Sequence, residues 1–193
     1  MKWLLLALWV LLPFAASAGP LSDTLFRTGD MTAALPLRFA HEDDGTLGEL
    51  TLSAPDAEGR MTLSHSVDDR TRPLGALPAE GGNPALLFFL ETVVRRMAEE
   101  TGGSPFYIRN RIREALVADT TPLPEPLPAG RTEIVVAPFA NDPNRDRMGW
   151  FADLRLGFTL DEAAPLPLVR LSADTGAGAG GYHSSLTLIA EDR

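Results

Sequence analysis

Two kinds of hydrophobic periodicity divide this chain of 193 residues, and they constrain its fold more than any other feature. In residues 84–117 the apolar side chains recur every three to four positions, which is typical of amphipathic helices. On both sides of this region they alternate at every second position, which is typical of strands. Connections of hairpin length favour antiparallel pairing. We therefore predict an α+β fold in which a two-helix hairpin packs on one face of a mainly antiparallel sheet.

The alternating segments predict about seven strands in the order βββ-αα-ββββ. The expected strands cover residues 37–41, 49–54, 61–67, 132–137, 150–160, 168–173 and 184–190. Proline and glycine mark the connections, so residues 68–82 are expected to form a loop, and the proline-rich residues 121–128 a surface connection. Residues 19–34 show no clear period and are expected to be irregular.

Local signals fix the ends of both helices. Asn83 is a suitable N-cap with Pro84 at the first helical position, and Gly102-Gly103 provides the stop. The second helix is expected to begin directly afterwards, with Ser104 as N-cap, and to run to about Val117.

The N-terminus has the parts of a secretory signal peptide. Lys2 precedes an apolar run from Trp3 to Phe14, and the small residues Ala16 and Ala18 fit a cleavage site before Gly19. Residues 3–18 are too few to span a bilayer, which takes about 20 residues. We expect residues 1–18 to be removed, residues 19–193 to form a single domain in the periplasm, and no membrane span to remain.

Composition excludes several kinds of chemistry. The chain has no cysteine, and Lys2 is its only lysine, so the expected mature chain lacks a thiol nucleophile, a disulfide and a Schiff-base amine. Its 16 arginines stand against 26 acidic residues, a formal charge of −10, which disfavours nucleic acid as a partner.

Motifs for metals, cofactors and catalysis are incomplete. The glycine run 176–181 is followed by a strand rather than a helix, so it predicts no dinucleotide site. Asp142 to Asp146 resembles the start of a calcium loop, but Arg147 occupies the position that needs glycine, and an Asx turn is the better interpretation. Ser104 is better explained as an N-cap than as a nucleophile. We therefore predict no catalytic residue, no metal and no cofactor.

His41 and His65 share the phase of the apolar residues on two strands that flank a third. A two-histidine site is conceivable, but two strand spacings separate the residues by about 10 Å, and no carboxylate completes a ligand set. The sequence therefore favours two independent structural histidines.

Two features indicate binding. Arg109 and Arg113 lie one turn apart on the second helix, with Tyr107 and Arg111 on an adjoining stripe, and such a cluster suits a carboxylate or phosphate. By alternation, the sheet face away from the helices is expected to mix apolar and charged residues: Val135, Phe151, Leu168, Ile189, Asp153, Arg155 and Arg170. The plainer interpretations are a solvated helix face and a sheet face covered by another segment.

The candidate ligand-binding residues are accordingly Tyr107, Arg109, Arg113, Phe151, Arg155 and Arg170. The leading hypothesis is a non-catalytic periplasmic domain that binds a partner protein or an amphipathic or anionic small molecule. The alternatives are a hydrolase that uses Asp, Glu, Ser or His, and a structural subunit of a cell-envelope assembly.

Overall fold

The computed structural model describes Leu25 and residues 35–78, 82–118, 126–127, 130–161, 163–164, 166–176 and 180–189. The expected leader, nearly all of residues 19–34, and most of the proline-rich segment 121–128 lie outside these residues.

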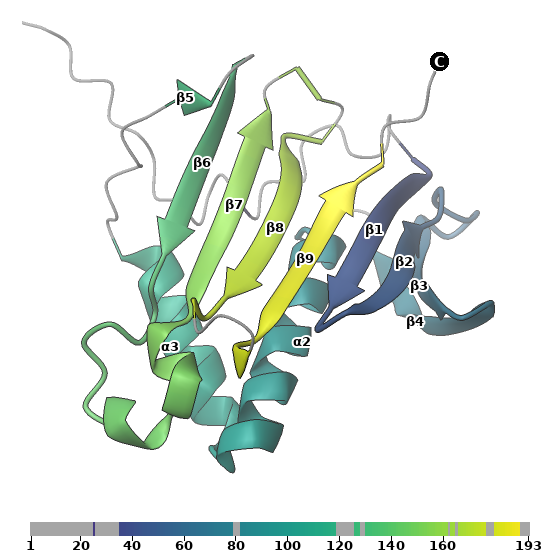
Figure 1. Cartoon of the computed structure of the whole chain (residues 1–193). Coiled ribbons are helices and arrows are strands. Elements are labelled where there is room, and N and C mark those ends of the chain that lie inside the picture. Colours follow the sequence, from purple (N-terminus) through teal and green to yellow (C-terminus); the bar gives the residue numbers. More distant parts are fainter. Residues whose placement is uncertain are drawn as a thin grey trace, which may run out of the picture.

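One antiparallel sheet forms the body of the described chain, and two helices cover one of its faces (Figure 1). The strand order is β4-β3-β2-β1-β9-β8-β7-β6-β5. The strands are β1 (Leu37–Asp43), β2 (Thr46–Leu52), β3 (Arg60–Val67), β4 (Arg70–Pro78), β5 (Pro126–Leu127), β6 (Arg131–Val136), β7 (Arg155–Asp161), β8 (Leu168–Asp174) and β9 (His183–Leu188). The predicted α+β class is confirmed, and the pairing of β1 with β9 joins the N-terminal and C-terminal strands into one sheet.

The helices begin and end where the capping residues predict. Asn83 accepts hydrogen bonds from the amides of Ala85 and Leu86 at the start of α2 (Pro84–Thr101), and Gly102 ends that helix with a φ of 66°. Ser104 caps α3 (Pro105–Val117). Because helix caps are local interactions, they can be read from sequence alone.

Residues 70–78 form a strand, not the loop that the prolines and glycines suggest. β4 is an edge strand, so the amide that Pro73 lacks leaves no gap in the sheet interior. A register shift between Leu63 and Ser64, beside Pro73 and Gly75, absorbs the irregularity. Pro126 and Leu127 likewise pair at the opposite edge.

The predicted strand 150–160 is also wrong in its first half. Gly149–Asp153 form a 3₁₀ helix, and β7 starts only at Arg155. This turn carries Phe151 into the core, where its side chain is fully buried. A register shift between Thr159 and Leu160 turns Leu168 to the core as well.

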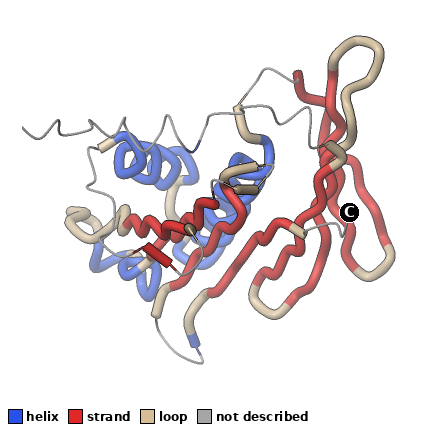
Figure 2. The backbone as a smooth tube through the Cα atoms, turned by 90° about the horizontal axis from the view of Figure 1, so that it is seen from above, coloured by secondary structure: helices blue, strands red, loops and turns tan. Residues whose placement is uncertain are grey.

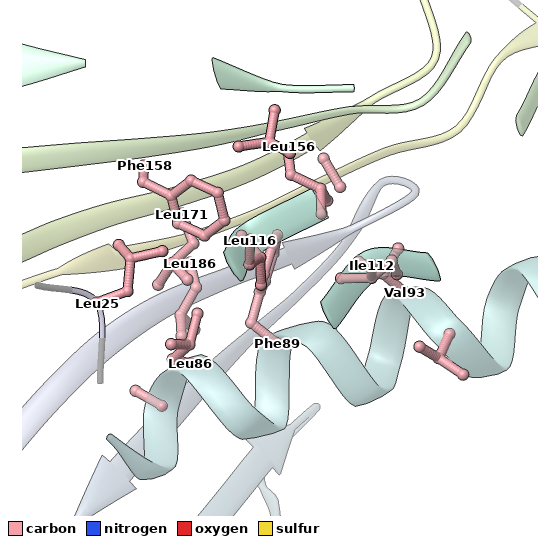
Figure 3. Close-up of a cluster of buried hydrophobic side chains, with 14 of the residues drawn as sticks. Leu25, Leu86, Phe89, Val93, Ile112, Leu116, Leu156, Phe158, Leu171 and Leu186 are labelled. Atoms are coloured by element: carbon pink, nitrogen blue, oxygen red, sulfur yellow. The ribbon is translucent and has the colours of Figure 1, made fainter. Parts of the chain in front are cut away.

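The core lies between α2 and the sheet. Figure 3 shows Phe89 of α2 among Leu156, Phe158 and other side chains of the sheet, with Leu25 at one side. Viewed from above, the sheet is strongly coiled, so the hairpin of β3 and β4 lies apart from strands β6 and β7 near the other end of the sheet (Figure 2). In the part of the chain that is described, no helix is long and apolar enough to cross a membrane.

Candidate functional site

Three rows of side chains on helix α2 face three different parts of the molecule: the core, helix α3 and the β3–β4 hairpin. Leu86, Phe89 and Val93 face the core. A second row lies against α3 and a third faces the β3–β4 hairpin, and each borders a hollow of about 560 Å³. Hollows of this size are in the range of small-molecule sites. The two hollows are therefore the candidate binding sites.

The first hollow, which we call the helix seam, lies between α2 and α3. Its walls are mainly apolar: Leu87, Leu90, Val94, Ile112 and Leu116, with Glu91, Arg109 and Arg113. Leu87 is 49% exposed, which leaves part of this apolar wall in contact with solvent. The seam therefore combines apolar surface with charged side chains from both helices.

Of the arginines predicted from sequence, Arg109 and Arg113 both line the seam. Arg109 donates to both carboxylate oxygens of Glu91 at 3.0–3.2 Å and so ties α3 to α2. Arg113 is exposed and makes no hydrogen bond or ion pair with any residue that the structure describes. The guanidinium N–H groups of Arg113 are thus available to bind an anion at the seam.

Tyr107, the third predicted residue of α3, lies outside both hollows. Its hydroxyl donates to Asp142 at 2.9 Å, and Arg111 donates to the same carboxylate at 2.8 Å. The amide of Asn144 completes the Asx turn predicted from sequence. Burial raises the pKa of Asp142, but the bonds from Asn144, Tyr107 and Arg111 outweigh it and hold the pKa below its usual value. This network anchors the 139–148 loop to α3, so Tyr107 has a structural partner.

The sheet face away from the helices has only part of the predicted mixed character: Val135, between the buried Ile134 and Val136, lies on it opposite Gly157. Phe151 and Leu168 are in the core, and the face carries mainly serine, threonine and charged side chains. Arg155 and Arg170 are exposed there, at register positions opposite Asp174 and Thr159. They are far apart in register from each other, and neither lines a described hollow with Arg113.

His41 and His65 meet directly, contrary to the separation predicted from strand spacing. Nδ1 of His41 lies 2.9 Å from Nε2 of His65, and both rings contact Phe88 of α2 at 5.1–5.2 Å between centroids. Gly48 of the intervening strand β2 is paired with His41. A Cβ on Gly48 would stand 3.0 Å from Nε2 of His65 and 2.7 Å from the carbonyl oxygen of Ser66. The missing side chain leaves the space in which the two rings meet across β2.

The hydrogen bond between the rings fixes their tautomers. Nε2 of His41 is buried and has no hydrogen-bond partner, so a proton there would be an unsatisfied buried donor. His41 therefore carries its proton on Nδ1 and donates it to Nε2 of His65. His65 in turn carries its own proton on Nδ1.

Both rings are neutral at pH 7. Burial lowers the pKa of His41 to about 4; His65 acts in the same direction and Asp43 opposes it. Burial, and next the charge of Arg72, also lower the pKa of His65, again against Asp43. His41 is only 5% exposed, whereas His65 is half-buried.

The second hollow, which we call the histidine cavity, surrounds this pair between α2 and strands β1, β3 and β4. Its apolar surface comes from Leu63, Leu74, Leu77, Leu87 and Phe88, and its polar surface includes Arg72, Glu91 and Arg95. Sequence reasoning missed this site because Arg72 lies in the segment taken for a loop. The sequence pattern that could have predicted the contact between the two histidines was their shared phase on two strands, together with a glycine in the strand between them.

Neither a familiar catalytic or metal-binding arrangement nor a similar protein assigns a function to the two hollows. Among the residues that the structure describes, no group of three potential ligands is placed to hold a metal, and no hydrogen bond joins a serine to a histidine. Comparison with protein-family models, with curated proteins and with solved structures finds no match.

Proposed function

We propose that this chain is an exported, non-catalytic binding protein whose helix seam holds an amphipathic anion. The observation that carries the proposal is the position of Arg113, an exposed cation without a partner among the described residues, at the edge of an apolar groove. An apolar tail would cover the exposed Leu87 and the partly buried Leu90, above a floor of buried Val94, Ile112 and Leu116, while the anionic head reaches the guanidinium.

Charge supports an anionic head. Glu91 is the acidic residue of the seam, and Arg109 already donates to both of its oxygens, so the seam has one uncompensated positive charge from Arg113. This local positive charge contrasts with the formal charge of −9 of the whole chain. A cationic head would meet Arg113 without a free carboxylate to balance it.

Calorimetric titration with dodecanoate, octanoate and dodecyltrimethylammonium tests the proposal. Dodecanoate should bind more tightly than octanoate, by roughly fourfold per methylene until the seam is filled, because each buried methylene contributes about 0.8 kcal/mol. Dodecyltrimethylammonium should bind more weakly than dodecanoate.

Arg113→Gln should weaken dodecanoate binding by roughly threefold to tenfold, the range expected for a charge-assisted hydrogen bond at an exposed rim. Arg147→Gln, which removes an exposed arginine from another part of the fold, is the matched control. Equal affinity for the two head groups, or an Arg113→Gln variant that binds like the wild type, would rule out the seam as an anion site. Binding of an acidic amphipathic peptide in place of dodecanoate would identify a partner protein as the occupant.

Export to the periplasm is supported by the leader sequence. Mass spectrometry of the protein recovered from cells should find Gly19 as the first residue. An intact Met1 on the mature protein would contradict export by cleavage.

A further inference from the structure

The histidine cavity has its own donors, which the proposed function does not use. Because Nε2 of His65 accepts the bond from His41, its remaining donor is Nδ1–H, which bonds to no residue in the described ranges. Arg72 is the direct cross-strand neighbour of His65 on β4, so the two side chains start about 5 Å apart on one face. Arg72 is exposed and is likewise without a partner among the described residues.

The charges around His65 nearly balance, so a carboxylate would be held by the unpaired donors Arg72 and Nδ1–H and not by a net positive charge. Asp68 and Arg70, of opposite charge, line an adjoining hollow with His65 and Arg72. From α2, Arg95 faces the histidine cavity together with Glu91, but Glu91 is shared between Arg95 at 3.4 Å and Arg109. From β1, Asp43 accepts a hydrogen bond from the hydroxyl of Tyr182, with 2.7 Å between the two oxygens, and keeps its negative charge. Farther along α2, Arg96 pairs with Asp44 and Glu100, and Glu99 lines the far end.

Apolar and aromatic side chains lie beside these donors. Phe88 contacts both imidazole rings, and Leu63, Leu74 and Leu77 line the cavity next to it. A ligand whose charged group reached Arg72 would therefore place its remaining atoms against a flat aromatic side chain and aliphatic groups.

We infer that the histidine cavity binds a small carboxylate with a flat apolar body, the carboxylate held by Arg72 and by Nδ1–H of His65 and the body lying against Phe88. This is a second site, on the opposite flank of α2 from the helix seam. It differs from the seam in the size and shape of its ligand, because a flat ring suits the aromatic cluster and a flexible chain suits the helix groove.

Binding at this site takes up a proton. The single hydrogen bond between the rings accommodates one N–H, so the pair of histidines accepts at most one additional proton without setting two donors against each other. Whichever ring carries that charge, the added proton leaves an N–H on Nε2 of His41, which is buried without a partner among the described residues and therefore opposes the uptake. A bound carboxylate offsets the positive charge of Arg72 and adds a negative partner, and both changes favour the protonated ring. Asp43 from β1 and Glu91 from α2 act in the same direction, whereas Arg95 and Arg96 oppose it.

Calorimetric titration with benzoate, benzamide and acetate tests this inference in the full chain. Benzoate should bind at least tenfold more tightly than benzamide, which lacks the charge, and than acetate, which lacks the ring. The benzoate affinity should rise several-fold from pH 7.5 to pH 5.5, and titrations in two buffers of different ionisation enthalpy should show proton uptake.

Arg72→Gln changes an exposed residue of an edge strand, and it should lower the benzoate affinity about tenfold. His65→Gln should remove the pH dependence, and Arg147→Gln should change neither. Unfolding midpoints of all variants verify that each is folded.

The inference is overturned if folded wild-type protein does not bind benzoate, if benzamide binds equally well, or if Arg72→Gln binds like the wild type. It is also overturned if Arg113→Gln, rather than Arg72→Gln, removes benzoate binding, because the ligand would then occupy the helix seam. Dodecanoate binding that depends on Arg113 and not on Arg72 would uphold the proposed function whatever the result with benzoate.

Discussion

Acidification should destabilise this protein in a pH range set by His41. A histidine whose pKa is lower in the folded state than in the unfolded state binds fewer protons when folded, so its contribution is complete above pH 6.5 and is lost as the pH falls. For His41 the loss extends from pH 6.5 down to about 4. These limits span about 2.5 pH units, and at about 1.4 kcal/mol per unit the free energy of unfolding should fall by about 3 kcal/mol.

Urea unfolding at half-unit steps between pH 7.5 and 4.5 measures most of this loss, about 2.5 kcal/mol, because the range ends half a unit above its lower limit. The carboxyl groups with lowered pKa values, Glu49, Asp56, Asp142 and Asp161, act mainly below this range, because their stabilisation is lost as the pH falls below about 4. His41→Gln should therefore remove most of the slope between pH 6.5 and 4.5 and leave the part due to His65, whose pKa is also lowered by burial. His183→Gln, outside the aromatic cluster, should keep the profile. A His41→Gln variant that still loses about 2.5 kcal/mol across this range would refute the assignment.

Three further outcomes follow from other parts of the structure. Gly48→Ala should destabilise the fold by about 2 kcal/mol, because the new Cβ meets the Ser66 carbonyl at 2.7 Å; Gly180→Ala, with open space around it, should be neutral in the same urea experiment. Asp142→Ala should lower the free energy of unfolding by about 3 kcal/mol, since Tyr107 and Arg111 lose a buried acceptor, and a loss below 1 kcal/mol would contradict the role given to this network. The midpoint of thermal unfolding should be the same with a chelator and with excess zinc, and a zinc-induced rise of several degrees would overturn the prediction that the chain holds no metal.

Much of the architecture could be predicted because it depends on neighbours in sequence. The caps at Asn83 and Ser104 and the stop at Gly102 fix the helices, and the period of the apolar residues fixes which side of each strand is buried. The same reasoning failed where partners across the sheet decide the result. The irregular pairing at Thr159 turned Leu168 to the core, and the position of β4 at an edge made Pro73 acceptable in a strand.

The candidate sites also combine features that depend on neighbours in sequence with features that depend on distant segments. Arg109 and Arg113 could be singled out because one helical turn separates them, but the sequence did not show that Glu91 of the other helix engages only the first. The contact between His41 and His65 depends on three strands in register and on Gly48 between them. By itself, the sequence determined the periodicities, the caps and the scarcity of reactive side chains, which are properties of short segments. Only the tertiary structure decided which charges remain uncompensated and which rings touch, because those depend on the pairing of segments distant along the chain.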